Sequence, residues 1–413
     1  MNAEKQRRTI KKTKNRNSFW VNGKMDLTFL FLVVGLLVTG LIMLFSASAP
    51  YASHYYSNSY HFISRQFMFA VGGFILMLIV SKIDYHVFKK FVWVITGVSI
   101  ALLILVLVMP ETKEGFKRWL NLGFIQFQPS EVAKFALIVL LSFLISKNYK
   151  KMKDFKFQIT LLGIIGLFCV LILVENHLSA TILVFTIGFV LMFIGGMSVK
   201  LIVGMASIGV GGVVMAIATG LISYASDRIQ YWIDPWKDEM GKGFQTIQSL
   251  LAIGSGGVMG RGIGQSNQKY LWLPEPQNDF IFAVVCEELG FIGAALIVIA
   301  FALLVWRGFT IALRAPDRFG MLMCIGLVFQ VGLQTVLNIL VVTNTLPNTG
   351  ISLPFFSYGG TSLVMLLVQM GIVLSISRSS NIEKTLEKHN ENSFCSRRNR
   401  RTYKSRFSCC RRT

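Results

Sequence analysis

The sequence predicts an all-α integral membrane protein with about ten transmembrane helices. Of its 413 residues, 53% are hydrophobic and 15% are charged, a balance far outside the range of a single soluble domain. Apolar runs of about 18 or more residues, each able to cross a hydrocarbon core about 30 Å thick, recur between Leu27 and Ile376. Because lipid cannot hydrogen-bond to open backbone groups, these runs must span the membrane as helices.

The apolar runs divide the chain into a membrane domain and two basic tails. The first run, Leu27 to Ser46, is too long for the core of a signal peptide and lacks a small-residue cleavage site, so we expect it to be retained. We expect a basic N-tail at 1–26, a membrane domain at 27–377 and a disordered basic C-tail at 378–413. The predicted helices are 27–47, 64–81, 90–109, 130–146, 158–174, 178–196, 199–221, 280–305, 319–343 and 359–377.

The basic residues predict the orientation of these helices. Lys and Arg gather in the tails and in short segments between apolar runs, and such segments are cytoplasmic by the positive-inside rule. The clearest cluster is Lys147, Lys150, Lys151, Lys153 and Lys156. We therefore expect both termini and 82–89, 147–157, 197–198 and 306–318 inside, and 48–63, 110–129, a tight corner at 175–177, 222–279 and 344–358 outside.

The outward segment 222–279, between the seventh and eighth helices, is too long for an ordinary connection. It is also too rich in Trp, Tyr, Ile and Leu to be disordered. Long ordered loops of this kind are usually functional, so we expect the chemistry of the protein here.

Composition and spacing exclude other classes of function. The formal net charge is +21, but no basic stripe with interleaved aromatic residues indicates nucleic-acid binding. The six cysteines have neither metal-ligand nor disulfide spacing, because Cys169, Cys286 and Cys324 lie in apolar runs and the others in the C-tail. His177 has no second ligand nearby, so we expect no metal site built from protein ligands.

Charged residues at the lip of the eighth helix predict a reactive site. Lys269, Glu275 and Asp279 stand where charges are costly unless they have a function. Asp279 precedes Phe280, Ile281 and Phe282, so its carboxylate can be partly desolvated and made more basic. It is a candidate general base, and the alternative is a helix N-cap that satisfies free amides.

The preceding segment, 254–264, has six glycines in eleven positions. It lacks the strand and the lysine of a nucleotide-binding loop, so the better interpretation is a tight turn near the membrane surface. Amides left free there for a phosphate-bearing ligand are the alternative.

Further charges lie inside or beside the predicted helices. Glu131 and Lys134 are one turn apart and can pair. Glu287 and Glu288 must face protein, water or a cation, and we expect them to make helix-packing contacts.

At these residues the chain resembles the SEDS family of bacterial shape, elongation, division and sporulation proteins, which includes FtsW, RodA and SpoVE. The resemblance covers nearly the whole hydrophobic length, and it looks closer to the division and sporulation branch. Mild departures are Asn278, where the family often has Thr, and the corner Glu175 to Ser179. The matching motifs are Arg118-Trp, Gln128-Pro-Ser-Glu-Val-Ala-Lys134, Asp234-Pro-Trp, Gly243-Phe-Gln-Thr-Ile-Gln-Ser249, the glycine segment, Leu273-Pro-Glu-Pro-Gln-Asn-Asp-Phe-Ile-Phe, Glu287-Glu-Leu-Gly and Leu353-Pro-Phe-Phe-Ser-Tyr-Gly-Gly-Thr-Ser362.

The resemblance implies a peptidoglycan glycosyltransferase of the bacterial cytoplasmic membrane that polymerises lipid II on its outer face. It maps the essential acidic residue of the family onto Asp279. It also implies a class B penicillin-binding protein as partner, together with other divisome or sporulation proteins. No cofactor is required by the sequence, and a divalent cation, Mg or Mn, is a candidate. The residues that we expect to bind substrate are Arg118, Glu131, Lys134, Arg228, Gln245, Gln248, Lys269, Glu275 and Ser357, with Arg118, Lys134, Arg228 and Lys269 as cationic contacts to diphosphate.

Two other functions are compatible with such a chain. A lipid II flippase would use Glu131, Lys134 and Glu288 to line a polar path, and a divisome scaffold would recruit other proteins. A transporter places its binding site near the membrane midplane, whereas the unusual residues of this chain gather on the outer face. That distribution favours the polymerase.

Overall fold

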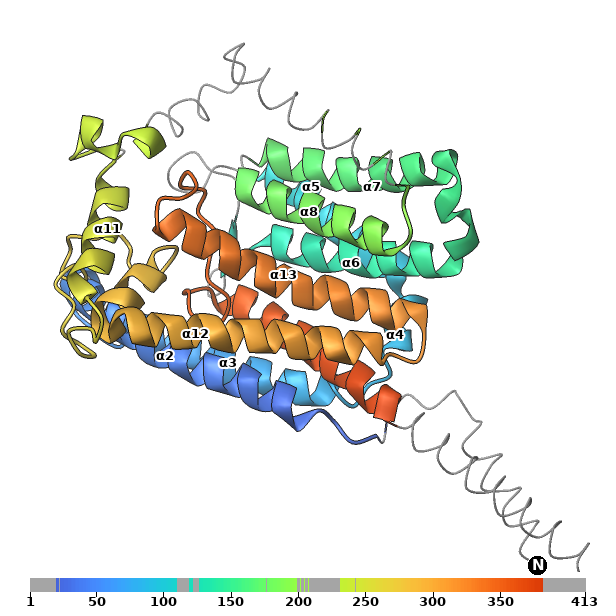
Figure 1. Ribbon diagram of the computed structural model, residues 1–413, viewed down its shortest axis with the longest axis horizontal. Coiled ribbons are helices and arrows are strands. Elements are labelled where there is room, and N and C mark those ends of the chain that lie inside the picture. Colours follow the sequence, from blue (N-terminus) through green and yellow to red (C-terminus); the bar gives the residue numbers. More distant parts are fainter. Residues whose placement is uncertain are drawn as a thin grey trace, which may run out of the picture.

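The protein is an all-α, multi-pass membrane protein (Figure 1). The structure, a computed structural model, describes residues 20–21, 23–109, 119–121, 126–175, 177–198, 231–241 and 243–381, together with Leu201, Gly204 and Ser207. The helices are α2 Leu27–Tyr56, α3 His61–Val80, α4 His86–Lys90, α5 Val92–Val108, α6 Pro129–Lys147, α7 Phe155–Val174, α8 Leu178–Ile194, α11 Phe244–Gly256, α12 Ile281–Leu313, α13 Arg318–Val342 and the last helix, Gly360–Asn381. Two 3-10 helices, η1 Tyr149–Lys153 and η2 Pro235–Asp238, and a small hairpin of β1 Leu120–Asn121 and β2 Gln126–Phe127 connect them.

Seven of the described helices are long and apolar enough to cross a membrane, and α5 and α8 are shorter apolar helices. These nine correspond to nine of the predicted spans. The remaining predicted span, 199–221, lies outside the described residues except for Leu201, Gly204 and Ser207, which are helical. The described part of the long loop between α8 and α12 is itself folded, because it contains η2 and α11.

Local sequence signals explain where several helices begin. Asp26 caps α2 by accepting a hydrogen bond from the amide of Phe29 at 3.0 Å, and Asp317 caps α13 through the amide of Gly320 at 3.1 Å. Pro129 occupies the first turn of α6, where a missing N–H costs nothing.

Two helices are longer than hydropathy predicted. The helix α2 runs to Tyr56 instead of about residue 47, and α12 runs to Leu313 instead of about 305. Hydropathy detects where a helix leaves the hydrocarbon, and nothing requires the helix to end there. The polar and aromatic residues after Ser46 therefore extend α2 beyond the apolar stretch.

The helices alternate in direction, so the connections gather at the two ends of the bundle (Figure 1). We call the left end in Figure 1 the loop end, and its described residues are 57–60, 119–121, 126–128, Glu175, His177, 231–241, 243–280 and 343–359. The opposite end, which holds 81–91, 148–154 and 314–317, is the tail end. At the tail end Arg307 of α12 pairs with Asp26 before α2 at 2.8 Å.

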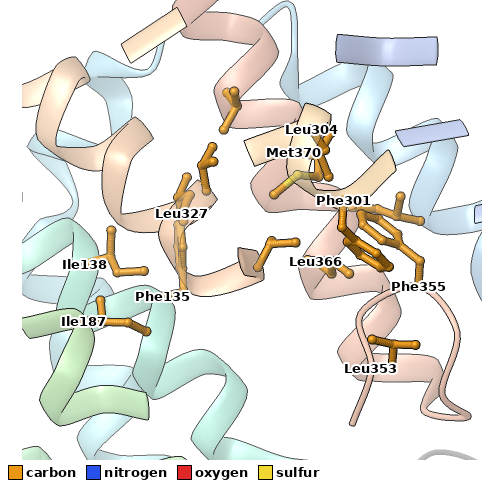
Figure 2. Close-up of a cluster of buried hydrophobic side chains, with 14 of the residues drawn as sticks. Phe135, Ile138, Ile187, Phe301, Leu304, Leu327, Leu353, Phe355, Leu366 and Met370 are labelled. Carbon is orange, nitrogen blue, oxygen red and sulfur yellow. The ribbon is translucent and has the colours of Figure 1, made fainter. Parts of the chain in front are cut away.

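The helices α6, α13 and the last helix form the centre of the bundle. Of their most apolar windows, 78%, 61% and 67% of residues are buried, against 22% in α3 and 28% in α12, which turn apolar side chains toward lipid. Figure 2 shows Phe135 and Ile138 of α6 close to Leu327 of α13 and Ile187 of α8. Beside them, Phe301 of α12 contacts the ring of Phe355. This packing holds the segment 351–358 against the helices that surround the site.

Candidate active site

A cavity of about 820 Å³ opens at the loop end of the bundle. Its walls come from α2, α3, α6, α8, α13 and the last helix, and from the two segments 275–279 and 350–359. Of the residues predicted to act in the site, five line this cavity: Asp279, Glu131, Lys134, Glu275 and Ser357.

Asp279 is held in the cavity wall by a buried amide of α13. The side-chain nitrogen of Asn338 donates hydrogen bonds of 2.7 Å to the backbone carbonyl of Asp279 and to that of Ile351. Gly350 adjoins the carboxylate so closely that a Cβ there would lie 3.1 Å from Oδ2 of Asp279. Phe280, not Asp279, holds the N-cap position of α12, and it makes no side-chain capping hydrogen bond.

Glu131 and Lys134 confirm the predicted pair on α6. The Lys134 ammonium donates to Oε1 of Glu131 at 2.7 Å, and the side chains are 2% and 14% exposed respectively. Lys134 is thus desolvated but charge-compensated within the cavity wall. The pair offers both a cation and an acceptor to a polar ligand.

Ser357 and Glu275 belong to the two segments that face each other across the site. The hydroxyl of Ser357 accepts a hydrogen bond from the amide of Leu353 at 2.8 Å, which closes a turn. The amide of Tyr358 donates to the carbonyl of Gln277 at 2.8 Å, which joins the segments. Glu275 is exposed and accepts a hydrogen bond from Asn278 at 2.8 Å.

Lys269 does not line the cavity. Its ammonium donates to Oε1 of Glu288 at 2.8 Å and to the hydroxyl of Ser46 at 3.1 Å, and the side chains of Lys269 and Glu288 are 3% and 0% exposed. The hydroxyl of Ser46 in turn donates to Glu288 at 2.7 Å. This buried triad ties α2, α12 and the loop before Asp279 together.

Glu287 anchors the same loop from its other side. Its carboxylate accepts hydrogen bonds from the hydroxyl of Ser266 at 2.5 Å and from the amides of Asn267 and Gln268 at 2.9 and 3.3 Å. Both glutamates therefore make packing contacts, as the sequence predicted. They fix a loop rather than line a path.

The glycine segment closes a break in α12. Gly290 has φ 67° and ψ −170°, which interrupts the helix and leaves carbonyls before it and amides after it without helical partners. The amides of Arg261 and Gly262 donate to the carbonyls of Glu287 and Glu288 at 3.0 and 2.9 Å. Because these two amides are occupied, the phosphate-cradle alternative is wrong for them, and the segment serves as a turn.

The remaining predicted residues lie away from the cavity wall or outside the described part. Gln245 of α11 donates to the carbonyl of Pro274 at 3.4 Å and accepts from Asn348 at 3.1 Å, so it braces both site segments. Gln248 is buried in α11 and does not line the cavity. Arg118 and Arg228 lie outside the described residues.

Several residues that line the cavity were not predicted. Arg65 of α3 is exposed and lines it, and no described carboxylate pairs with it. Gln330 and Gln334 of α13 line it too, and the buried Oε1 of Gln330 has no hydrogen-bond partner among the described residues. With Asn338 they stand four residues apart, a polar stripe on an apolar helix that the sequence displays.

The described residues contain no group of three or more His, Cys, Asp or Glu side chains arranged to hold a metal ion. We therefore derive no step of the chemistry through a divalent cation. The candidate cation stays a prediction, which the metal dependence of purified protein tests.

Comparison with known proteins identifies the family. The family model for the cell cycle proteins FtsW, RodA and SpoVE matches residues 27–382. The chain is 39% identical over 358 residues to stage V sporulation protein E of Bacillus subtilis, covering 86% of this chain and 97% of that protein. It is 38% identical over 357 residues to the probable peptidoglycan glycosyltransferase FtsW of Geobacter sp. strain M18, covering 85% of this chain and 96% of that protein.

Solved structures agree with the sequence comparison. A chain of a peptidoglycan synthase complex that coordinates polymerization and crosslinking is 29% identical, with a TM-score of 0.70 over 86% of this chain and 98% of that one. The rod shape determining protein RodA of Thermus thermophilus is 26% identical, with a TM-score of 0.62 over 86% of this chain and 97% of that one. With a matching family model, close relatives and a shared fold, this chain belongs to the FtsW, RodA and SpoVE family of cell cycle proteins.

Proposed function

We propose that the chain is a peptidoglycan glycosyltransferase that polymerises lipid II at the outer face of the cytoplasmic membrane, in cell division or sporulation. The observation that carries this proposal is the position of Asp279. Its backbone is fixed by Asn338, and it lines one cavity together with the Glu131 and Lys134 pair and with Arg65. A carboxylate beside cations in a cavity at the bundle end suits attack on a lipid-linked diphosphate sugar.

The reaction joins two lipid-linked disaccharides. The 4-hydroxyl of one GlcNAc attacks the anomeric carbon of the other MurNAc, a C–O bond forms, and the bond to undecaprenyl diphosphate breaks. Asp279 accepts the hydroxyl proton as general base. The leaving diphosphate carries away the electron pair of the broken bond, and nearby cations stabilise its charge.

The cationic contacts to diphosphate come from Arg65 and Lys134 among the described residues, with Arg118 and Arg228 kept as predictions. Arg65 is the stronger candidate, because Lys134 is already compensated by Glu131. We assign Lys269 instead to positioning the loop, since Glu288 and Ser46 occupy its ammonium. Gln330 and Gln334 offer amide groups to the hydroxyls and amides of the substrate.

The orientation follows from the basic residues of the tail end. The exposed lysines of η1 and its flanks lie there, between α6 and α7, so that end is cytoplasmic by the positive-inside rule. The loop end, with the cavity, then faces outward. Both chain termini lie on the cytoplasmic side.

The polymerase works with a partner. We infer that a class B penicillin-binding protein, a single-pass protein that crosslinks peptides, forms a complex with this chain, because the described fold contains no domain for crosslinking. The related chain in a complex that coordinates polymerization and crosslinking supports this inference. Other divisome or sporulation proteins complete the assembly.

The proposal is tested with purified protein, lipid II and the partner. Asp279→Asn removes the proton acceptor at nearly constant size, so folding should survive and polymerisation should fall by about 10²-fold or more. Asp234→Asn and Asp238→Asn, from the same loop, serve as controls with milder effects. Polymerisation by folded Asp279→Asn protein at the wild-type rate would falsify the general-base role.

The flippase remains the alternative, and the same preparations distinguish it. In liposomes, a flippase moves fluorescent lipid II between leaflets in the absence of the partner and independently of Asp279. Such transport, together with absent polymerisation when partner is supplied, contradicts the polymerase. Polymer formation that depends on Asp279 supports it.

A further inference from the structure

Two polar contacts between α2 and α12 are spaced about as far apart as the two boundaries of a hydrocarbon core. At the tail end Arg307 pairs with Asp26 at 2.8 Å, and at the loop end Ser46 bonds Glu288 at 2.7 Å. A helix rises about 1.5 Å per residue, so the stretch of α2 between them is about 30 Å long, the thickness of a hydrocarbon core. The contact between Ser46 and Glu288 therefore lies near the outer boundary of the hydrocarbon.

The last turns of α2 stand above that boundary. By the same rise, Tyr51 lies about 7 Å and Tyr56 about 15 Å above Ser46. The headgroup layer adds about 5 to 7 Å on each side of a bilayer. A tyrosine that anchors a helix at the membrane interface lies within the headgroup layer. Tyr56 lies beyond that layer, at the height of the sugars of a lipid-linked saccharide.

Five aromatic side chains around the end of α2 and the start of α3 line the cavity, and we call them the aromatic wall: Tyr51, Tyr56, His61, Phe62 and Tyr358. The rings of Tyr56 and His61 stack with centroids 4.0 Å apart and planes 10° apart. The ring of Phe62 packs edge-on against Tyr358 at 5.0 Å. The rings therefore hold one another in place, and the wall is formed before any ligand arrives.

The cavity chemistry changes along the membrane normal. Arg65 lies one turn of α3 below His61, toward the membrane, and also lines the cavity. Its cation is thus nearer the phosphate level, and the rings of Tyr56, His61 and Phe62 stand above it. The sequence of cation and then rings matches the sequence of diphosphate and then sugars in a lipid-linked glycan.

We propose that the aromatic wall is a carbohydrate-binding site that retains the saccharide of the membrane-linked glycan between successive additions. This inference rests on the proposed function, which supplies the saccharide. The axial C–H groups of a pyranose carry partial positive charge and pack against the negative face of an aromatic ring. Such packing does not depend on which sugar of the glycan lies against the rings. It therefore suits a glycan strand that advances by one disaccharide at each step.

The test compares Tyr56 with a nearby tyrosine that lies outside the aromatic wall. Tyr56 is 51% exposed and lines the cavity, whereas Tyr60 is 63% exposed, does not line it and stacks on Phe45, outside the wall, so Tyr60→Ala is the control. Glycan strand length and the initial rate of lipid II consumption are measured with the partner present. We expect Tyr56→Ala and Tyr56→Leu to shorten the strands by about three- to tenfold, where tenfold corresponds to about 1.4 kcal/mol. Tyr56→Phe and Tyr60→Ala should leave the length unchanged.

A second measurement separates this inference from the proposed function. Binding of a soluble GlcNAc–MurNAc oligosaccharide to the detergent-solubilised chain is compared for wild type, Tyr56→Ala and Tyr56→Phe. Weaker binding by Tyr56→Ala alone supports the wall even if the chain forms no polymer. Equal binding by all three proteins overturns the aromatic wall, and so does a wild-type strand length from folded Tyr56→Ala protein. In either case, polymerisation that still depends on Asp279 leaves the proposed function standing.

Discussion

The side-chain amide of Asn338 donates a 2.7 Å hydrogen bond to the backbone carbonyl of Asp279. The same nitrogen bonds the carbonyl of Ile351, so one buried amide of α13 sets the distance between the two segments that form the site. Asn338 contacts no solvent, since its side chain is fully buried. Its contribution to activity is therefore through the placement of Asp279.

Asn338→Ala is expected to lower kcat by about tenfold while changing KM little, because the base is displaced and the cavity walls remain. The assay is lipid II polymerisation at several substrate concentrations. Thr335→Ala is the control, because Thr335 is buried on the same helix but bonds only the carbonyl of Val331 within it. Equal kinetics for the two variants would show that Asn338 does not position the base.

Gly350→Ala is expected to reduce activity by about tenfold or more. The new methyl group would lie 3.1 Å from Oδ2 of Asp279, and φ of 70° costs a residue with a side chain about 1–2 kcal/mol. Gly359→Ala is the matched control in the same segment, where the nearest atoms lie 3.6 Å away. If both variants polymerise lipid II alike, the contact at Gly350 is unimportant.

Lys269→Met is expected to destabilise the protein by about 3–5 kcal/mol, because it leaves the buried carboxylate of Glu288 without its cation. Removing both charges with Lys269→Met and Glu288→Leu should restore much of that loss. Thermal unfolding in detergent measures both, and exposed Lys237→Met should change nothing. A double variant no more stable than the single one would argue against the ion pair as the cause.

A cluster at the tail end predicts a dependence of stability on pH. Hydrogen bonds to Asp317 and Asp84 raise the pKa of His86 from 6.5 to about 9. Because the folded pKa is the higher one, the stabilisation is fully present below pH 6.5 and is lost as pH rises through about 9. Unfolding temperature should therefore fall over this window more in wild type than in His86→Asn. Parallel curves for the two proteins would contradict the assignment.

Much of the fold was predictable because hydrophobic length reports directly on the membrane. Local pattern also identified Asp279 and the pair of Glu131 and Lys134, since charges beside apolar runs stand out at once. The end of α2 was missed because a helix can continue in water without an apolar signal. The end of α12 was placed too early because Arg307 interrupts an apolar run that in fact continues to Leu313.

Contacts between residues that are far apart in the sequence could not be predicted from local sequence patterns. The sequence predicted that Lys269 binds diphosphate. The fold instead brings Ser46 and Glu288, which are distant in sequence, into contact with its ammonium group. The polar stripe of Gln330, Gln334 and Asn338 is visible at helical spacing. It was not predicted to be part of the site, because a neutral amide in an apolar helix is a weaker indication of function than a charged side chain. Arg65 was not singled out, because a single arginine near a helix end is commonly a side chain that reaches the membrane interface.

The interruption of α12 at Gly290 bears on how the protein is made. The amide of Phe291 finds its acceptor on Gly257, and the carbonyls of Glu287 and Glu288 find donors on Arg261 and Gly262, all earlier in the chain. Open backbone groups at the lipid boundary are costly, so the interlock should close as soon as α12 enters the bilayer. It needs nothing from α13 or the last helix, which leave the ribosome later. The glycine segment can thus take its shape during translation, whereas the stretch around Asp279 waits for Asn338 and Tyr358, which emerge later.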